Sequence, residues 1–580
     1  MNVSGLYRNL AEYVAALEKA GELVRISVPV DPVLEIAELT DRQAKQPGGG
    51  KALLFENTET GFPVLTNMMG SERRICMALG VERLSEVGER IEALLADAMR
   101  PKAGWMDKLK MLPLLKEVSA WMPRSVSRRR GECQQVVRRG DEADLSELPV
   151  LKCWPHDGGR FVTLPLVHTV DPETGVRNVG MYRMQVFDSR TTGMHWHRHK
   201  TGERHYRQYE KRGERMPVAV CLGGDPVYTY CATAPLPDGI DEYMLAGFLR
   251  RRPVELVKCL TCDLRVPGDC DFVIEGYVDP AEPKAVEGDF GDHTGFYSLK
   301  DLYPRFHVTC ITHRRDAVWP ATLVGVPPME DAYIQLATER IFLAPIRLAV
   351  APEVVDLWMP PAGVAHNIAV CVIEKSYAGQ ALKVAHALWG AGQMSFNKFL
   401  VVLSAEDARG VSGSGYAAVV RERLHRFDPA RDALFSRGVL DVLDHSAPQT
   451  GFGGKLCLDL TRKTAEEGGE RPYREMMPVE AVWDDFVREA GLPFDDLLWL
   501  AAGNTDPVRD VSITAEGVLR LDARFKPSAV ERGWPNVVTM SREAIERVDA
   551  RWREYGFEGE PLPSPSRRYL PLVRSHTAEL

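Results

Sequence analysis

The chain has 580 residues, of which 45% are hydrophobic and 26% are charged, and its formal net charge is −9. This length exceeds what one hydrophobic core supports, so we expect several globular domains. The negative charge argues against a nucleic-acid-binding surface, and no apolar run approaches the roughly 18 residues that a membrane-spanning helix needs. Eleven scattered cysteines are typical of reduced thiols, which favours a cytoplasmic location.

Hydrophobic patterning divides the chain into four regions. Residues 1–120 combine an amphipathic helix at 6–20 with short strands, for example at 23–28 and 52–55. Residues 121–325 contain short β-like runs separated by Gly, Pro and Asp, which predicts a mainly-β domain with one helix at 239–252. Residues 326–475 and 476–580 form the last two regions.

The third region has a different pattern. An apolar run at 368–373, helical spacing at 378–389 and a second apolar run at 399–403 predict a strand, a helix and a parallel strand. Residues 326–475 are therefore expected to form an α/β domain. Residues 476–580 are a C-terminal extension that we expect to contribute to contacts between subunits.

A glycine-rich segment carries two acids that could act together. Glu287 and Asp292 lie five positions apart in Glu-Gly-Asp-Phe-Gly-Asp-His-Thr-Gly-Phe-Tyr, a pattern that predicts a tightly turned loop. Paired acids in one pocket can differ in protonation and divide general acid and general base work between them. The alternative is an acidic surface turn.

A second segment combines an arginine with alternating histidines. His195, His197 and His199 would place their side chains on one face of a strand, and such histidines with a carboxylate suit Mn²⁺ or Zn²⁺. Arg183 could hold a substrate carboxylate through a planar two-point contact. The alternative is a polar β-ribbon with surface histidines.

Three further features have a functional and a structural interpretation. Glu242 lies in the first turn of the helix predicted at 239–252, where the helix dipole alone would favour an acid. Lys398 precedes the strand at 399–403 and either contacts a phosphate or is simply exposed. Cys259 and Cys262 form a CxxC pair, but no fourth zinc ligand is evident at a suitable spacing, so structural cysteines are expected.

Taken in order along the chain, these segments resemble the UbiD family of decarboxylases, over roughly residues 1–475. The resemblance rests on Asn178 to Arg183, Glu287 to Tyr297 and Gly325-Val-Pro-Pro, with support from Tyr377-Ala-Gly-Gln and Asp428-Pro-Ala-Arg-Asp. It implies an α/β multidomain fold in which an N-terminal α/β domain, a central split β-barrel of the flavin-reductase type and a C-terminal α/β domain follow one another.

The resemblance also implies a cofactor, prenylated FMN, held with Mn²⁺ and K⁺ and supplied by a flavin prenyltransferase. Self-association into a homo-oligomer is implied as well. The catalytic residues would be Arg183, Glu287 and Asp292, although some members have glutamate at the last position. The metal ligands would be Asn178, His199 and Glu242, and the cofactor contacts Thr163, Asn178, Arg183 and Lys398, with His195 and His197 as neighbours of unassigned role.

The motifs that carry the resemblance do not by themselves select a substrate. The stretch from Gly453 to Thr464 and the long C-terminal extension are more similar to the menaquinone-pathway branch, which predicts a 1,4-dihydroxy-6-naphthoate-type acid. The alternatives are a polyprenyl-4-hydroxybenzoate and a catabolic phenolic or heteroaromatic acid. Outside this class, a metal-dependent hydrolase could use the three histidines with Glu242 as base, and a flavin-binding protein could lack catalysis altogether.

Overall fold

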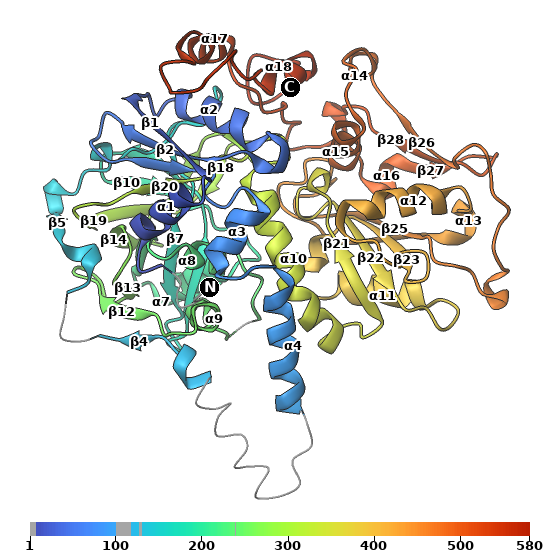
Figure 1. Cartoon of the computed structure of the whole chain (residues 1–580), viewed down its shortest axis with the longest axis horizontal. Helices are drawn as coiled ribbons and strands as arrows, with labels where there is room; N and C mark the ends of the chain where they lie inside the picture. Colours follow the sequence, from blue (N-terminus) through green and yellow to red (C-terminus); the bar gives the residue numbers. More distant parts are fainter. Residues whose placement is uncertain (1–6, 100–117, 127–129, 238) are drawn as a thin grey trace, which may run out of the picture.

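The computed structural model describes residues 7–99, 118–126, 130–237 and 239–580, and the chain has a mixed α/β fold of several domains. Two lobes are visible in Figure 1, with helix α10 (Glu330–Ala349) between them. The N-terminal and central elements form one lobe, and the sheet that contains β22 and β23 forms the core of the other. None of the described helices is long and apolar enough to cross a membrane.

The N-terminal region contributes three strands to a four-stranded sheet. Its order is β1 (Leu23–Pro29), β2 (Ala52–Asn57), β3 (Val64–Thr66) and β20 (Trp319–Ala321), so the last strand comes from the far end of the central region. The predicted N-terminal helix is confirmed as α1 (Leu10–Lys19), whose apolar face is buried as expected. Further helices of this region are α2 (Glu35–Ala44), α3 (Glu72–Leu79) and α4 (Ser85–Met99).

The central region forms a large antiparallel sheet. Its order is β6 (Phe161–Val162), β9 (Met184–Asp188), β10 (Thr191–Gly193), β19 (Arg305–His313), β14 (Phe272–Val278), β11 (Met216–Leu222), β7 (Leu166–Val170) and β8 (Arg177–Met181), and β5 (Val136–Arg139) also pairs with β19. The helix predicted at 239–252 is confirmed as α9 (Glu242–Arg250). Around the sheet lie α7 (Thr201–Arg212), α8 (Pro226–Cys231), β4 (Arg124–Ser125), β12 (Glu255–Lys258) and β13 (Arg265–Pro267).

The C-terminal lobe confirms the predicted strand–helix–strand unit. Strand β22 (Ile368–Ile373), helix α11 (Gln380–Trp389) and strand β23 (Phe399–Ser404) follow one another, and the two strands are parallel. All six residues of β22 are buried, because helices and loops cover both faces of a parallel sheet. The full order is β21 (Val354–Trp358), β22, β23, β25 (Phe452–Asp459) and β24 (Ala433–Val439), with α12 (Tyr416–Leu424) and α13 (Pro429–Asp432) beside it.

The C-terminal extension packs against both lobes of its own chain. In Figure 1, α17 (Arg542–Arg551) lies beside α2. There the fully buried Arg42 donates to the Asp549 carboxylate at 2.6 Å and to the Leu562 carbonyl at 2.8 Å. The other elements are β26 (Val479–Val482), α14 (Asp485–Glu489), α15 (Phe494–Asn504), α16 (Pro507–Asp510), β27 (Val511–Ile513), β28 (Leu519–Asp522) and α18 (Ser566–Tyr569). A role of this segment between subunits stays a prediction.

Candidate active site

Arg183, between β8 and β9, joins the two acids of the glycine-rich segment. Its Nε and Nη2 groups donate to Glu287 Oε1 at 3.0 and 2.7 Å, and its Nη1 group donates to Asp292 Oδ2. Nη2 also donates to the Ser298 hydroxyl at 3.0 Å. Four of the five guanidinium N–H groups are thus directed to protein acceptors. Because these contacts use the flat fork of the guanidinium, lysine could not reproduce them.

Two short antiparallel strand pairs, one lying within the other along the chain, place the acids on either side of Arg183. Glu287 ends β15 (Ala285–Glu287), which pairs with β18 (Asp301–Tyr303), and Asp292 follows β16 (Phe290–Gly291), which pairs with β17 (Tyr297–Ser298). Close packing explains Gly288, since a Cβ there would lie 2.7 Å from the Cα of Gly158. The guanidinium of Arg183 lies 4.7 Å from the Phe290 ring, which adds a cation–π contact.

The two oxygens of Glu287 have different environments. Oε1 accepts hydrogen bonds from Arg183 and from His195 Nδ1 at 2.7 Å, whereas Oε2 is buried without a hydrogen-bond partner among the described residues. Burial alone would raise the pKa of Glu287, yet Arg183 and His195 hold that pKa below its ordinary value. The carboxylate is therefore ionised at neutral pH, with one oxygen held in place and the other available.

Asp292 forms a second charged pair with the residue that follows it. Its Oδ1 accepts from the His293 backbone N–H at 2.8 Å and from His293 Nδ1 at 3.0 Å. Burial would raise the pKa of Asp292, but Arg183 and His293 lower it. Burial would likewise lower the pKa of His293, yet Asp292 raises it to about 9. The acid is ionised and the histidine is protonated at neutral pH.

The strand predicted for the alternating histidines is wrong. Residues 194–200 are an irregular segment and a turn between β10 and α7, in which the His197 carbonyl accepts from Lys200 N at 2.9 Å. His195 is buried against Glu287 and His197 is half-buried, whereas His199 is exposed. The three side chains therefore do not share one face, because the turn that leads into α7 breaks the period of two.

His195 is a contact of Glu287 that the sequence left without a role. Burial and the nearby Arg183 lower the pKa of His195, so its ring is neutral. An ionised carboxylate can only accept hydrogen bonds, so Nδ1 of His195 must carry the ring proton and donate it in the hydrogen bond to Glu287. Nε2 of His195 is then an acceptor. His197 Nε2 contacts that atom and therefore acts as its donor.

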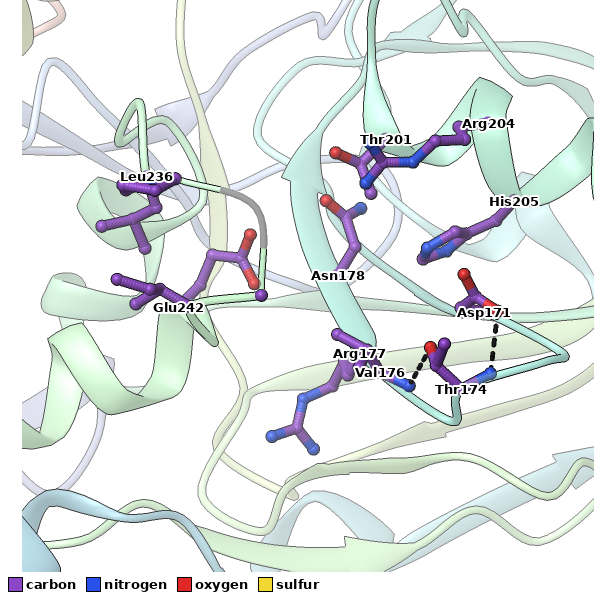
Figure 2. Close-up of a pocket in the computed structure, with 13 residues that line it drawn as sticks. Asp171, Thr174, Val176, Arg177, Asn178, Thr201, Arg204, His205, Leu236 and Glu242 are labelled. Carbon is purple, nitrogen blue, oxygen red and sulfur yellow. Dashed lines mark hydrogen bonds between the residues drawn. The ribbon is translucent and has the colours of Figure 1, made fainter. Parts of the chain in front are cut away.

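Two of the three predicted metal ligands lie at one pocket. A cavity of about 180 Å³ opens between β8 and α9, and Figure 2 shows Glu242 on one wall with Asn178 and Arg204 on the other. Glu242 Oε2 accepts from Val179 N at 3.0 Å, and burial raises the pKa of Glu242 to about 7. The amide and carboxylate oxygens of Asn178 and Glu242 are hard donors of the kind that Mn²⁺ prefers. His199 does not line this pocket but an adjacent hollow, and Arg204 borders both.

The two predicted cofactor contacts outside this pocket lie in different lobes. Thr163 follows β6, and its hydroxyl accepts from Thr322 N at 3.0 Å. Lys398 is fully buried at the start of β23 and is ion-paired with Asp444 at 2.7 Å. The alternative of an exposed lysine is therefore wrong. A buried lysine needs such a partner, and Ser446 at 3.1 Å supplies a further acceptor.

Three models of one protein family match most of this sequence. They describe the N-terminal domain of 3-octaprenyl-4-hydroxybenzoate carboxy-lyase (residues 14–94), its Rift-related UbiD domain (124–327) and its C-terminal domain (332–460). The chain belongs to the UbiD family of carboxy-lyases. Its Arg183, Glu287 and Asp292 all fall within the Rift-related UbiD match.

Relatives with known sequences and structures agree with this membership. An uncharacterized protein of Aquifex aeolicus is 47% identical over 488 residues, which are 82% of this chain and 98% of that protein. The UbiD-class enzyme HmfF of Pelotomaculum thermopropionicum, solved in an evolved dimeric form with prFMN, is 27% identical with a TM-score of 0.64 over 79% of this chain and 96% of HmfF. Vanillic acid decarboxylase of Sedimentibacter hydroxybenzoicus in its closed form is 25% identical with a TM-score of 0.69, over 85% of this chain and 99% of that one.

The UbiD-family models end at residue 460, but residues beyond it hold the loop that carries Asp292. Trp499 Nε1 donates to the Thr294 carbonyl at 2.7 Å, and Val538 N donates to the Gly295 carbonyl at 2.9 Å. Tyr297 N donates to the Asn536 carbonyl at 3.1 Å, and Asn536 N donates to the Ala578 carbonyl at 2.7 Å. The C-terminal extension thus holds the loop that carries Asp292 through hydrogen bonds to its backbone.

We expect Gly295→Ala to destabilise this loop strongly. Gly295 has a φ of +79°, and an added Cβ would lie 2.5 Å from the Trp499 ring. The left-handed backbone costs about 1–2 kcal/mol and the overlap about 1–3 kcal/mol. Faster hydrogen exchange in residues 290–298 would show the loss.

Gly21→Ala is the matched control, because Gly21 has a φ of +70° with nothing within 4 Å of the added Cβ. It carries the backbone cost alone. If the two substitutions cause equal losses of hydrogen-exchange protection around their own positions, packing against Trp499 does not hold the loop.

Proposed function

We propose that this chain is a prenylated-FMN-dependent decarboxylase of an aromatic or α,β-unsaturated carboxylic acid, acting reversibly and without net oxidation. The observation that carries the proposal is the buried Arg183–Glu287–Asp292 network with one Glu287 oxygen left without a partner among the described residues. Buried charges are expensive, so a network with one free acceptor indicates a group that receives or delivers a proton.

Each residue of the network has a separate task. Glu287 rests as a carboxylate, so its Oε2 would first take up a proton from solvent and then deliver it to the substrate carbon that has lost CO₂, while Oε1 stays fixed by Arg183 and His195. Arg183 keeps Glu287 and Asp292 ionised before substrate binds. The Trp499 contact fixes the loop that carries Asp292.

The chain offers donors for the cofactor and its ions. Bound prenylated FMN would supply the electron sink that loss of CO₂ from an unsaturated carbon requires. Asn178 and Glu242 would hold Mn²⁺, and His199 would join them after a movement of the turn before α7. K⁺ would help to bind the phosphate group of the flavin, and Thr163 and Lys398 would contact the cofactor, which a flavin prenyltransferase would supply. HmfF, which was solved with prFMN, supports this assignment.

The proposal extends to the domain boundaries and to subunit assembly. We assign residues 1–120 and 326–475 to α/β domains, residues 121–325 to a split β-barrel of the flavin-reductase type, and residues 476–580 to an extension. The antiparallel central sheet supports the barrel. A cytoplasmic homo-oligomer is expected, and the dimeric form of HmfF supports self-association.

Our first candidate substrate is a 1,4-dihydroxy-6-naphthoate-type acid of menaquinone synthesis. A polyprenyl-4-hydroxybenzoate and a catabolic phenolic or heteroaromatic acid are the alternatives, and the vanillic acid decarboxylase among the structural neighbours favours the phenolic class. A metal-dependent hydrolase built on His195, His197 and His199 is not favoured, because of these three side chains only His195 and His197 are in contact.

Native mass spectrometry of protein co-expressed with a flavin prenyltransferase tests the cofactor. We expect one prenylated FMN and one Mn²⁺ per chain, a flavin absorbance spectrum, and CO₂ release from one of a panel of naphthoic, hydroxybenzoic and heteroaromatic acids. Metal without flavin, despite ample cofactor supply, would contradict the proposal.

We expect His195→Ala to lower kcat about tenfold, the effect of losing one hydrogen bond of roughly 1.4 kcal/mol to a charged group. His195 helps to lower the pKa of Glu287, so removing it raises that pKa. The limb of the pH profile that Glu287 governs should therefore move to higher pH. His195→Gln retains an N–H donor and should restore part of both effects, whereas an unchanged profile in His195→Ala would exclude this positioning role.

A further inference from the structure

The CxxC pair acquires a third potential metal ligand in the folded chain. Cys259 and Cys262 lie in the loop between β12 and β13, and this loop covers Glu275 of β14. One ligand atom from each of the three residues lies within 4.8 Å of the others. The sequence did not reveal Glu275 because it belongs to another strand.

Glu275 is a buried acid for which the described part of the chain supplies no cationic partner. Its side chain is 0% exposed, and no ion pair to it is found among the described residues. The donors to this carboxylate within the described ranges are uncharged: Leu260 N at 2.8 Å from both oxygens, and Thr261 N and Oγ1 at 2.6 and 2.9 Å from Oε2. Buried carboxylates are normally paired with a cation or bound to a metal ion.

The hydrogen bonds leave room for a metal bond. A carboxylate has about four lone-pair positions, and Oε1 accepts a single hydrogen bond. Cys259 is buried and Cys262 is partly exposed, so an ion could enter from the Cys262 side. Tetrahedral zinc with Zn–S bonds of about 2.3 Å places its ligand atoms about 3.8 Å apart, so the three groups would need to approach by ~1 Å or less.

We propose that Cys259, Cys262 and Glu275 bind a thiophilic divalent cation, with zinc as the ion that best fits two sulfurs and one oxygen. Both thiols lose their protons to solvent on binding, and water completes the tetrahedron at the exposed side. This site differs in chemistry from the Asn178–Glu242 pocket, whose oxygen donors suit Mn²⁺. It would fix the β12–β13 loop to the central sheet, and its role is structural.

The test uses the full chain, stripped of metal and then given Zn²⁺ under reducing conditions. Native mass spectrometry after buffer exchange should find one tightly held zinc per chain, and Co²⁺ in its place should give a thiolate-to-cobalt charge-transfer band. Cys259→Ser and Cys262→Ser should each abolish the band, and Glu275→Gln should weaken zinc binding at least tenfold.

Two controls separate this site from other thiols and from the proposed cofactor site. Cys371→Ala, which alters a buried cysteine of β22, and Glu242→Gln should both keep the zinc and the band. Zinc binding that survives in the Cys259→Ser/Cys262→Ser double variant would overturn the proposal, as would its absence from the reduced wild-type chain. If Glu275→Gln does not fold, the partly exposed Cys262 still decides the outcome.

Discussion

Glu287→Gln is expected to lower kcat by about 10²–10⁴-fold, the usual contribution of a positioned general acid. The amide keeps the shape of the side chain and can still accept from Arg183, but it supplies no proton from the position of Oε2. Cofactor content and far-UV circular dichroism should remain those of the wild type. Steady-state CO₂ release and the flavin spectrum, measured on the same preparation, check both expectations.

Glu282→Gln is the matched control for this substitution. Glu282 is an acid of the same region, half-buried, and bonded to His307 at 2.7 Å rather than to Arg183. Its replacement should leave turnover near normal. Near-normal turnover of Glu287→Gln as well would show that this acid does not deliver the proton, whereas loss of the flavin would point to a cofactor-binding role.

Arg183→Met is expected to cost roughly 3–5 kcal/mol of local stability, because it leaves the buried Glu287 carboxylate without its cation, whereas Asp292 keeps its pair with His293. Glu287 and Asp292 are 1% and 7% exposed, so water cannot replace the guanidinium unless the strand pairs that hold them open. Hydrogen exchange in β8, β9 and β15 reports the loss directly, without assuming that a chain of several domains unfolds in one step.

A combined variant separates electrostatics from packing in this prediction. Adding Glu287→Gln to Arg183→Met removes the stranded charge and leaves the Asp292–His293 pair intact, so protection should largely return. Arg190→Ala, which breaks the exposed pair with Asp141, should change protection little. If hydrogen-exchange protection does not return in the combined variant, Arg183 acts through packing on Phe290 rather than through charge.

The elements that local patterning predicts are those whose burial repeats along the sequence. Helices α1 and α11 follow because each buries one regular face, and strands β22 and β23 follow because each is a continuous, almost fully buried apolar run. The Arg183–Glu287–Asp292 site could be predicted because the acids share one short glycine-rich segment and the family resemblance supplied the arginine.

Features that depend on distant residues could not be predicted in this way. The strand expected at His195 failed because a turn before α7 ends the alternation. Glu275 beside the CxxC loop and Trp499 behind Thr294 join segments that no local pattern connects. Lys398 shows the same limit, since its partner Asp444 belongs to a loop before β25.

The hydrogen bonds from residue 578 through Asn536 to Tyr297 affect how this protein can be handled in experiments. Leu580 N also donates to the Trp534 carbonyl at 2.9 Å, so the final residues are an anchored part of the structure. A purification tag fused after Leu580, or a deletion made to probe subunit assembly, would disturb the hydrogen bonds that support the segment with Asp292. Loss of activity in such a protein would then report a loosened loop rather than a dissociated oligomer, and tags are better placed elsewhere.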